Sequence, residues 1–465
     1  MKWKRNGRFL VTSLKDCPKS FLSILEKKIR LTIRDFDVIR DKVKVTHQLL
    51  CIIKNDLFLL PVGFYSFVKQ LCNKLQIPAS FDLNYPPIKT NLSVLENENL
   101  RPYQKEFIQK IIDGITQGTG GILSAPPAFG KSYILRLLVD IFPESVIDIV
   151  SRRRDVIGTI RKYLEQDNIA YGLVTTGSRT YGRITLYTAQ SLNHSPFNAD
   201  IVILDEAHEL VTDAIFKKLF SYKDARMIAL TATPDTRYDN RHRRLEALAG
   251  PILFSVDYKT TVNLGLNKPV VVFWYEIEEG YVPEGATTIL RKRMGIWYNK
   301  YLNQKVAEIA KKYYEQGKQV LVLVDALAHA KNIAQLLPEF VVCYGSGRKK
   351  GFGNLSRGQR EKIRKAFEKR EIMGVIATKI WSVGVSFNDL EVLIRADGTG
   401  SHTESIQIPG RVSRIPELSS KEYGIVVDFD PTFDVRLHAQ ALRRQRYYRK
   451  YGWIQILPTG EIIKP

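Results

Sequence analysis

Three consecutive residues, Gly130, Lys131 and Ser132, have the types and the order needed to hold a chain of phosphates. A glycine permits a tight turn, a lysine places a point charge on the outer phosphates, and a small hydroxyl can bind Mg²⁺. These residues end the stretch Ala125-Pro-Pro-Ala-Phe-Gly-Lys-Ser. This stretch departs from the phosphate-loop pattern G-x-x-x-x-G-K-[ST] at its first position, where Ala125 replaces glycine. The expected ligand is a triphosphate with Mg²⁺. The other loop residues expected to line it are Pro127, Ala128 and Phe129.

A pair of adjacent carboxylates, Asp205 and Glu206, follows the apolar run 201–204. One carboxylate can bind Mg²⁺ and the next can orient the attacking water, which is the acid pair that phosphoryl transfer needs. Ser132 and Asp205 are therefore the expected magnesium ligands. The loop and the carboxylate pair together are far more specific than either alone.

The elements that must position these residues form an alternating pattern. The apolar run 121–124 precedes the phosphate loop, and the helical pattern of 133–139 follows it. Further strand-like runs, with helical segments between them, cover residues 146–150, 184–187, 201–204 and 227–230. Because unbroken apolar strands that alternate with helices are typical of parallel sheets, the fold class is α/β. A second strand, 319–324, follows a long helical pattern over 298–314 and begins another such region.

Composition sets the class of protein. The 465 residues are enough for two or three domains, and 44% hydrophobic with 25% charged residues is ordinary for a globular chain. No apolar run has membrane-spanning length, and the first residues lack the apolar core of a signal peptide, so a cytoplasmic protein without a membrane partner is expected. The four cysteines have no metal-ligand spacing and are expected to be buried, reduced thiols.

The net charge of +22 indicates a polyanionic partner. Residues 1–95 hold 17 basic and seven acidic side chains, so nearly half of the excess falls in about a fifth of the chain. A strand over 57–60, a helix over 64–75 and the prolines Pro78, Pro86 and Pro87 predict a small mixed domain followed by a linker. We expect this domain to bind a nucleic-acid backbone, although a solvated basic face would give the same composition.

The order of the motifs resembles the two motor lobes of superfamily two helicases and translocases. The first-lobe motifs are Leu100-Arg-Pro-Tyr-Gln104, Ala125 to Ser132, Thr188-Ala-Gln-Ser-Leu192, Asp205-Glu-Ala-His208 and Leu230-Thr-Ala-Thr-Pro234. The second-lobe motifs are Gly374-Val-Ile-Ala-Thr378 with Gly384-Val-Ser386, and Gln407-Ile-Pro-Gly-Arg411-Val-Ser-Arg414. The resemblance covers residues 100 to about 430 and is strongest to phage UvsW-type branch-migration helicases and their XPB- and RecG-like relatives. Three motifs depart from the family pattern: Ala128 and Ser386 replace a usual Gly and Asp, and Ser151-Arg-Arg-Arg-Asp155 replaces a usual Pro-Thr stretch.

The resemblance implies two tandem RecA-like lobes with ATP bound in the cleft between them. The domains expected are a basic N-terminal domain (1–95), lobe 1 (96–262), lobe 2 (263–435) and a basic C-terminal extension packed on lobe 2 (436–465). An aromatic residue followed by glutamine can hold an adenine, so Tyr103 and Gln104 are expected to contact the base and Gly384 to contact the nucleotide.

The resemblance also assigns roles outside nucleotide binding. Catalysis is expected from Lys131, Asp205, Glu206, Gln407, Arg411 and Arg414, the last three being supplied by lobe 2. Coupling between the nucleotide and the track is expected from His208, Thr231 and Thr233. Contacts to the nucleic acid are expected from Arg152, Arg153, Gln190, Ser191 and Thr378.

The expected function is that of a monomeric DNA helicase or branch-migration motor. It would act on single-stranded, forked, bubble or junction DNA in replication, recombination or repair, in a bacterial or phage-infected cell. Three alternatives stay open: a DEAH-type RNA helicase, a duplex-DNA translocase without strand separation, and an ATP-binding clamp that no longer hydrolyses, suggested by Ala128 and Ser386. Residues 276–293 are expected to form a loop or hairpin, and 345–353 a flexible link or a phosphate-contacting loop. Residues 437–450 are expected to form a basic helix leading to a strand over 453–457.

Overall fold

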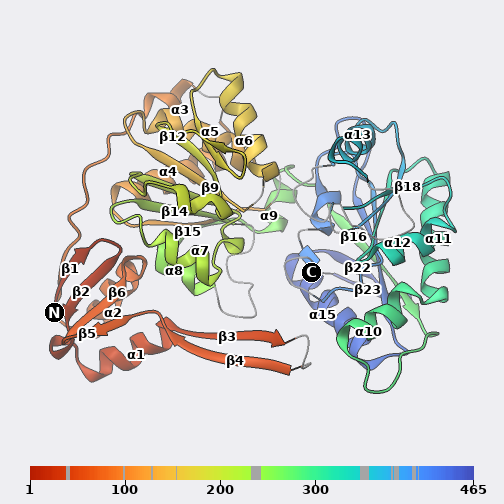
Figure 1. Cartoon of the computed structure of the whole chain (residues 1–465), viewed down its shortest axis with the longest axis horizontal. Coiled ribbons are helices and arrows are strands. Elements are labelled where there is room, and N and C mark those ends of the chain that lie inside the picture. Colours follow the sequence, from red (N-terminus) through yellow and green to blue (C-terminus); the bar gives the residue numbers. More distant parts are fainter. Residues whose placement is uncertain are drawn as a thin grey trace. The chain divides into compact units, whose positions relative to one another are not determined.

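The computed structural model describes residues 1–37, 42–97, 100–126, 129–152, 154–231, 242–345, 355–378, 381, 387–400, 405–406 and 408–464. These residues form two compact units, the first made of Met1–Asp37 and Lys42–Val256 and the second beginning at Asp257 (Figure 1). In the part of the chain that is described, no helix is long and apolar enough to cross a membrane.

The first unit begins with a small mixed domain. Its five-stranded sheet has the order β5-β6-β2-β1-β7, and a separate antiparallel hairpin, β3–β4, extends from it. The side chains of Trp3, Phe21 and Phe58 meet in its core, where ring centroids lie 6.1–6.3 Å apart. The elements are β1 (Lys2–Asn6), β2 (Phe9–Ser13), η1 (Leu14–Asp16), α1 (Lys19–Ile29), β3 (Arg30–Asp37), β4 (Lys42–Leu49), β5 (Ile52–Lys54), β6 (Leu57–Pro61), η2 (Val62–Phe64), α2 (Tyr65–Lys74) and β7 (Ser80–Asp82).

This N-terminal domain shares its core with lobe 1. The buried guanidinium of Arg8 donates hydrogen bonds to the backbone oxygens of Ala225, at 2.6 Å, and of Leu248. A Cβ added to Gly63 would lie 1.8 Å from the Glu246 oxygen, so the two backbones approach as closely as a glycine allows. The side chain of Ala247 belongs to the hydrophobic cluster of the N-terminal domain. The domain is therefore fixed on α8 (His242–Ala249) rather than tethered by a linker.

Replacing Arg8 by methionine is expected to destabilise the first unit, because the buried oxygens of Ala225 and Leu248 would lose their donor. An unsatisfied buried acceptor costs about 1–3 kcal/mol. The measurement is the free energy of unfolding from a urea titration followed by tryptophan fluorescence. The exposed Lys4→Met is the control and should change it by less than about 0.5 kcal/mol. Equal values for the two variants would contradict the role given to Arg8.

Lobe 1 is a mostly parallel sheet with the strand order β11-β10-β12-β9-β13-β14-β8-β15, in which only β11 is antiparallel to its neighbour. Its central strands are buried along their whole length, which explains their unbroken apolar runs. The elements are α3 (Ser93–Asn97), α4 (Pro102–Thr116), β8 (Gly120–Ser124), α5 (Lys131–Ile141), β9 (Ile147–Ser151), α6 (Arg154–Gln166), β10 (Gly172–Thr175), β11 (Ser178–Arg179), β12 (Ile184–Thr188), η3 (Ala189–His194), β13 (Ile201–Asp205), η4 (Ala207–Glu209), α7 (Asp213–Leu219), β14 (Arg226–Thr231), α8 and β15 (Ile252–Ser255).

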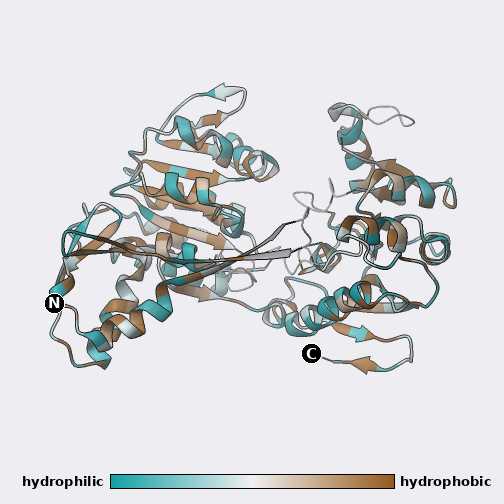
Figure 2. Ribbon diagram, turned by 60° about the horizontal axis from the view of Figure 1, so that its bottom comes forward, coloured by the Kyte–Doolittle hydropathy of each residue, from teal (hydrophilic) through white to brown (hydrophobic). Residues whose placement is uncertain are grey.

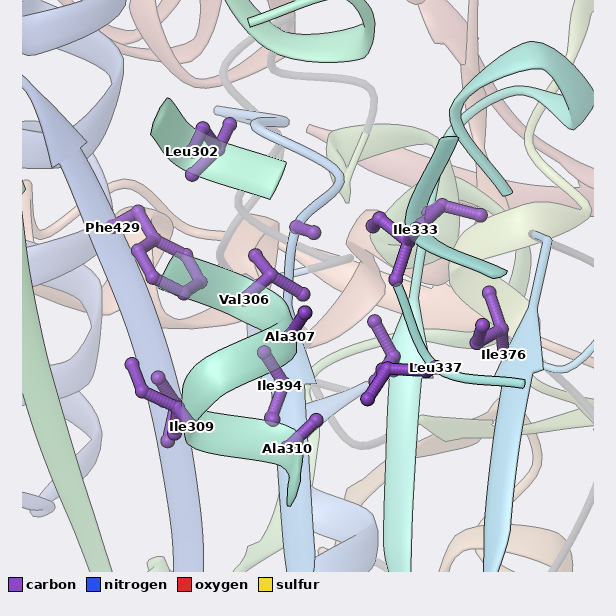
Figure 3. Packing of buried hydrophobic residues seen from close by; sticks show 14 of the residues in the cluster. Leu302, Val306, Ala307, Ile309, Ala310, Ile333, Leu337, Ile376, Ile394 and Phe429 are labelled. Carbon is purple, nitrogen blue, oxygen red and sulfur yellow. The ribbon is translucent and has the colours of Figure 1, made fainter. Parts of the chain in front are cut away.

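The second unit contains a sheet of the same kind, with the order β18-β19-β17-β20-β21-β16-β22-β23 and one antiparallel pair, β22–β23. Figure 3 shows α11 laying Val306, Ile309 and Ala310 against Ile394 and Phe429 of the sheet. The elements are α9 (Tyr258–Asn263), β16 (Val270–Ile277), α10 (Thr288–Lys292), η5 (Arg293–Trp297), α11 (Lys300–Glu315), β17 (Val320–Leu323), α12 (Leu327–Ala334), β18 (Val341–Cys343), α13 (Arg357–Glu368), β19 (Gly374–Ala377), β20 (Val392–Arg395), η7 (Pro409–Ser413), β21 (Gly424–Pro431), α15 (Val435–Tyr451), β22 (Ile454–Ile456) and β23 (Ile462–Ile463).

Hydropathy follows this architecture. In Figure 2 the strands of both large sheets are mainly brown, and the helices that cover them show both brown and teal, as helices with one buried face do. The α/β fold class with two large parallel sheets and a small mixed N-terminal sheet is confirmed. All four cysteines are free thiols, and Cys51 alone among them is only partly buried.

Three details refine the picture given by the sequence. Residues 276–293 begin at the end of β16 and are irregular only over 278–287. Thr287 then accepts a hydrogen bond from the Leu290 N–H at 3.3 Å and so caps α10. The C-terminal residues do more than pack on lobe 2, because β22 pairs with β16 and extends its sheet. The division between the units falls at Val256 and Asp257, so α9 lies in the second unit.

Candidate nucleotide and nucleic-acid site

The phosphate loop joins β8 to α5, as the sequence predicts. Gly130 has a φ of +89°, a left-handed conformation that favours glycine, and it caps the N-terminus of α5. Ala125 does not have a positive φ, so the backbone at the first position of the loop does not require a glycine. The ammonium of Lys131 donates to the Ala125 oxygen at 2.9 Å, which holds the lysine over the loop. The N–H groups at the start of α5, with this lysine beside them, make a site suited to an anion.

Tyr103 and Gln104 lie next to the loop. The ring of Tyr103 packs on that of Phe129, at 4.9 Å between centroids. The side-chain oxygen of Gln104 accepts the Arg101 N–H at 3.1 Å and caps α4. The side-chain nitrogen of Gln104 lies 3.0 Å from the position that a Cβ on Gly130 would occupy, so Gln104 lies against the loop. The pair is thus in place beside the loop, and its contact with a base stays a prediction.

The carboxylate pair stands at the carboxyl end of β13. Glu206 has φ +47° and ψ +47°, a left-handed conformation that non-glycine residues seldom adopt and that often marks functional turns. Its N–H donates to Asp205 Oδ1 at 2.9 Å. The buried ring of His208 is 3.5 Å from Glu206 Oε2 and shares a hydrogen bond of 3.1 Å with the Thr231 hydroxyl, through Nδ1 in both cases. The ring of His208 therefore lies between the Glu206 carboxylate and the end of β14.

The parallel sheet brings these residues to one edge. Lys131 follows β8, Asp205 ends β13 and Thr231 ends β14, and carboxyl ends of parallel strands meet at the same edge. Hydroxyl and carboxylate oxygens of the kind that Ser132 and Asp205 provide are what Mg²⁺ prefers. No group of three or more His, Cys, Asp or Glu side chains suited to a metal occurs among the described residues. The residues fit a magnesium ion that keeps waters and arrives with the phosphates of its nucleotide.

The arginines of the second unit lie on and after η7. The side chain of Arg411 is 7% exposed. Arg414 is partly buried, its Nη1 donates to Asn388 Oδ1 at 3.4 Å, and burial lowers the pKa of its guanidinium. The Ser413 hydroxyl lies 2.6 Å from the Gly410 oxygen and 3.0 Å from Asn267 Oδ1, which fixes the turn between the two arginines.

The expected nucleic-acid contacts differ in exposure. Arg152 and Gln190 are exposed. Ser191 is buried and its hydroxyl accepts a hydrogen bond from Thr188 at 3.0 Å, so it holds the turn that presents Gln190. Thr378 is partly buried just after β19, and its N–H donates to the Cys343 oxygen at 3.1 Å. Arg153, together with Pro127, Ala128, Thr233, Gly384, Ser386, Gln407 and 346–353, lies outside the described residues.

Sequence reasoning missed the residues that support the loop from behind. The rings of Phe107 and Phe254 lie 5.1 Å apart, and both pack on Phe129, at 5.1 and 5.8 Å. Phe107 could have been found as an apolar position of its helix. Phe254 lies far along the chain on β15, and no local signal relates it to the loop.

Comparison with known proteins agrees with this geometry. Two family models match the chain: "Type III restriction enzyme, res subunit" over residues 97–236 and "Helicase conserved C-terminal domain" over residues 303–416. "DNA 3'-5' translocase XPB2" of Sulfurisphaera tokodaii is 22% identical over 384 residues, which cover 71% of this chain and 81% of the relative.

Solved structures align with most of this chain. "S. cerevisiae Dbp5 bound to RNA and ADP BeF3" aligns with 79% of this chain and 92% of its own at a TM-score of 0.53 and 12% identity. "The crystal structure of T4 UvsW" covers 98% of this chain and 99% of its own at a TM-score of 0.41 and 16% identity. The DEAH-box and branch-migration assignments, the roles in replication, recombination or repair, and the phage or bacterial host stay predictions.

The two matched models fall on the regions that form the two large parallel sheets. The chain is an ATP-hydrolysing member of the superfamily two helicases.

Proposed function

We propose that the protein is a DNA motor that uses ATP to move along or remodel forked, bubble or junction DNA. The observation that carries this proposal is the contact between the Thr231 hydroxyl and the His208 ring, which itself lies 3.5 Å from the catalytic Glu206 carboxylate. This contact offers a route by which a change at the nucleotide can reach the end of a neighbouring strand. Thr233, two residues on, is proposed to continue that route.

The proposed reaction uses residues of both units. Lys131 would hold the outer phosphates, Ser132 and Asp205 the Mg²⁺, and Glu206 would orient the attacking water. Bound Mg²⁺ would neutralise charge on the phosphates. Gln407, Arg411 and Arg414 would reach the transferred phosphate during turnover, where a planar guanidinium offers fixed donors to the spreading charge.

DNA is favoured over RNA as the track by two observations. The relative from Sulfurisphaera tokodaii is named as a DNA translocase. The N-terminal domain is basic and is fixed on lobe 1, so a duplex bound there would be held at a constant position relative to the first motor lobe. Arg152, Arg153, Gln190, Ser191 and Thr378 are proposed to act at the track, mainly through phosphates, and sequence preference should be slight.

The substrate test compares stimulation of ATP hydrolysis by single-stranded DNA, forked DNA, duplex DNA and RNA. The forked and single-stranded DNAs should stimulate most. Stronger stimulation by RNA would favour the RNA-helicase alternative, and stimulation by duplex alone with no strand separation would favour a duplex translocase.

Lys131→Ala should lower the stimulated rate of ATP hydrolysis by about 10²–10³-fold, the usual effect of removing one preorganised donor. The exposed Lys162→Ala on α6 is the matched control and should behave as the wild type. Because deletion of residues 1–95 would uncover the core shared with α8, loss of activity in such a deletion would not by itself indicate a DNA-binding role.

A further inference from the structure

The long helix α15 of the second unit has a composition that its own stability does not explain. Its 17 residues include five arginines and one lysine and not a single acidic residue. One of these, Arg444, is buried, and its guanidinium holds Asp428 through two hydrogen bonds of 3.0 Å. Arg436, Arg443, Arg446, Arg449 and Lys450 are exposed.

Four of the exposed cations share one face. At about 100° per residue, Arg436, Arg443, Arg446 and Lys450 fall within roughly 80° of one another, and we name them the α15 basic stripe. The buried residues of the helix are Leu437, Ala441, Arg444 and Tyr448, and their mean direction is about 145° from that of the stripe. The stripe therefore points away from the sheet on which α15 packs.

A network of buried polar groups fixes the rotation of the helix. The Tyr448 hydroxyl donates to Asp428 Oδ2 at 2.7 Å, and Arg395 Nη1 donates to the Tyr448 oxygen at 2.7 Å. At the start of α15, Asp434 accepts the Leu437 N–H at 2.9 Å, and at its end Gly452 takes a left-handed φ of +95°. A helix held at both ends and along its buried face presents its outer face as a rigid row.

The helix dipole does not account for the whole stripe, and α15 itself carries no acidic residue. Cations are favoured in the last turn, which covers Lys450, but Arg436 lies in the first turn, where a positive charge is unfavourable. Arg443 and Arg446 are three residues apart, and Arg446 and Lys450 are four, so they repel each other on the helix surface. A bound polyanion would attract each of these cations and so offset the repulsion between them.

The length of the stripe matches a nucleic-acid strand. Arg436 to Lys450 spans about 21 Å along the helix at 1.5 Å per residue. Phosphates of one strand repeat every 3.4 Å along the duplex axis, so this length faces about six of them. We propose that the α15 basic stripe is a phosphate-binding surface for nucleic acid on lobe 2, in addition to the contacts expected from the motif residues. This inference rests on the proposed function, since it supplies that motor with a further contact to its track.

The test compares two double variants of the full chain that remove the same charge. Arg443→Gln with Arg446→Gln changes the stripe, and Lys311→Gln with Lys312→Gln changes exposed lysines on α11 of the same unit. The dissociation constant for a fluorescent forked DNA is measured between 50 and 300 mM salt without nucleotide. The slope of log affinity against log salt is negative. Loss of two phosphate contacts should make it less steep by about 1.4–1.8. The α11 variant should keep the wild-type slope, and both variants should keep the ATPase rate measured without DNA.

Two results would overturn the inference: an unchanged slope in the stripe variant, or an equal decrease in both variants, which would indicate a diffuse effect of net charge. Failure of the proposed function is recognised separately, because wild-type protein would then show no stimulation of ATP hydrolysis by any nucleic acid. If nucleic acid stimulates ATP hydrolysis by the wild type but the stripe variant keeps the wild-type salt slope, the stripe is rejected and the proposed function stands.

Discussion

Replacing Arg411 by alanine is expected to lower the maximal rate of nucleic-acid-stimulated ATP hydrolysis by about 10³–10⁵-fold, the range found when an arginine that stabilises a transferring phosphate is absent. ATP binding should be much less affected, because Lys131 and the N–H groups of α5 remain. Arg411→Lys should restore only part of the rate, since an ammonium lacks the planar pair of donors. The measurements are kcat from a phosphate-release assay and ATP affinity from a fluorescent analogue.

The control for this experiment must be another arginine of the same unit with limited exposure. Arg370 serves, because its guanidinium pairs with Glu391 at 3.0 Å and no role in the reaction is assigned to it. Arg370→Ala should keep kcat within about tenfold of the wild type. If Arg411→Ala loses no more activity than this control, and both variants melt at similar temperatures, Arg411 does not act on the phosphate.

Replacing Glu206 by glutamine is expected to slow hydrolysis by about 10²–10⁴-fold, the usual contribution of a positioned acid–base group. Glutamine has the same size and can take the same left-handed turn, but it cannot accept a proton from water. ATP should therefore stay bound and uncleaved. Single-turnover hydrolysis of radiolabelled ATP measures the chemical step, and filter binding measures retained nucleotide.

Glu209→Gln is the matched control for Glu206→Gln, because it makes the same chemical change three residues away in the same segment. It should leave the rate of cleavage near that of the wild type. Wild-type cleavage in the Glu206 variant would show that another group orients the water, and the assignment would have to be withdrawn.

Much of the fold and of the nucleotide site follows from local sequence. Lys131, Asp205 and Thr231 lie within contiguous motifs at the ends of apolar strands, and a parallel sheet necessarily gathers such ends at one edge. The tight turn at Gly130 was also predictable, because glycine adopts a positive φ without a steric penalty and so favours such turns before a helix.

The contacts that local patterns could not predict join residues far apart in the chain. No local pattern around Arg8 predicts its hydrogen bond to α8. Gly63 resembles an ordinary turn residue in the sequence, and only the structure shows that the backbone of Glu246 packs against it. Arg444 could have been counted with the exposed arginines around it, because its spacing alone does not show that Asp428 lies beneath the helix.

The packing of the N-terminal domain on α8 has a consequence for synthesis on the ribosome. Arg8 and its acceptor Leu248 are 240 positions apart. At about 5–20 residues per second, Arg8 emerges roughly 12–48 s before Leu248 is made. During this interval the surface of the nascent domain that Ala247 will cover stays open to water and to other chains. We expect a ribosome-bound chain that stops before α8 to be digested rapidly by protease within its first 80 residues, and one that extends past β15 to be protected there.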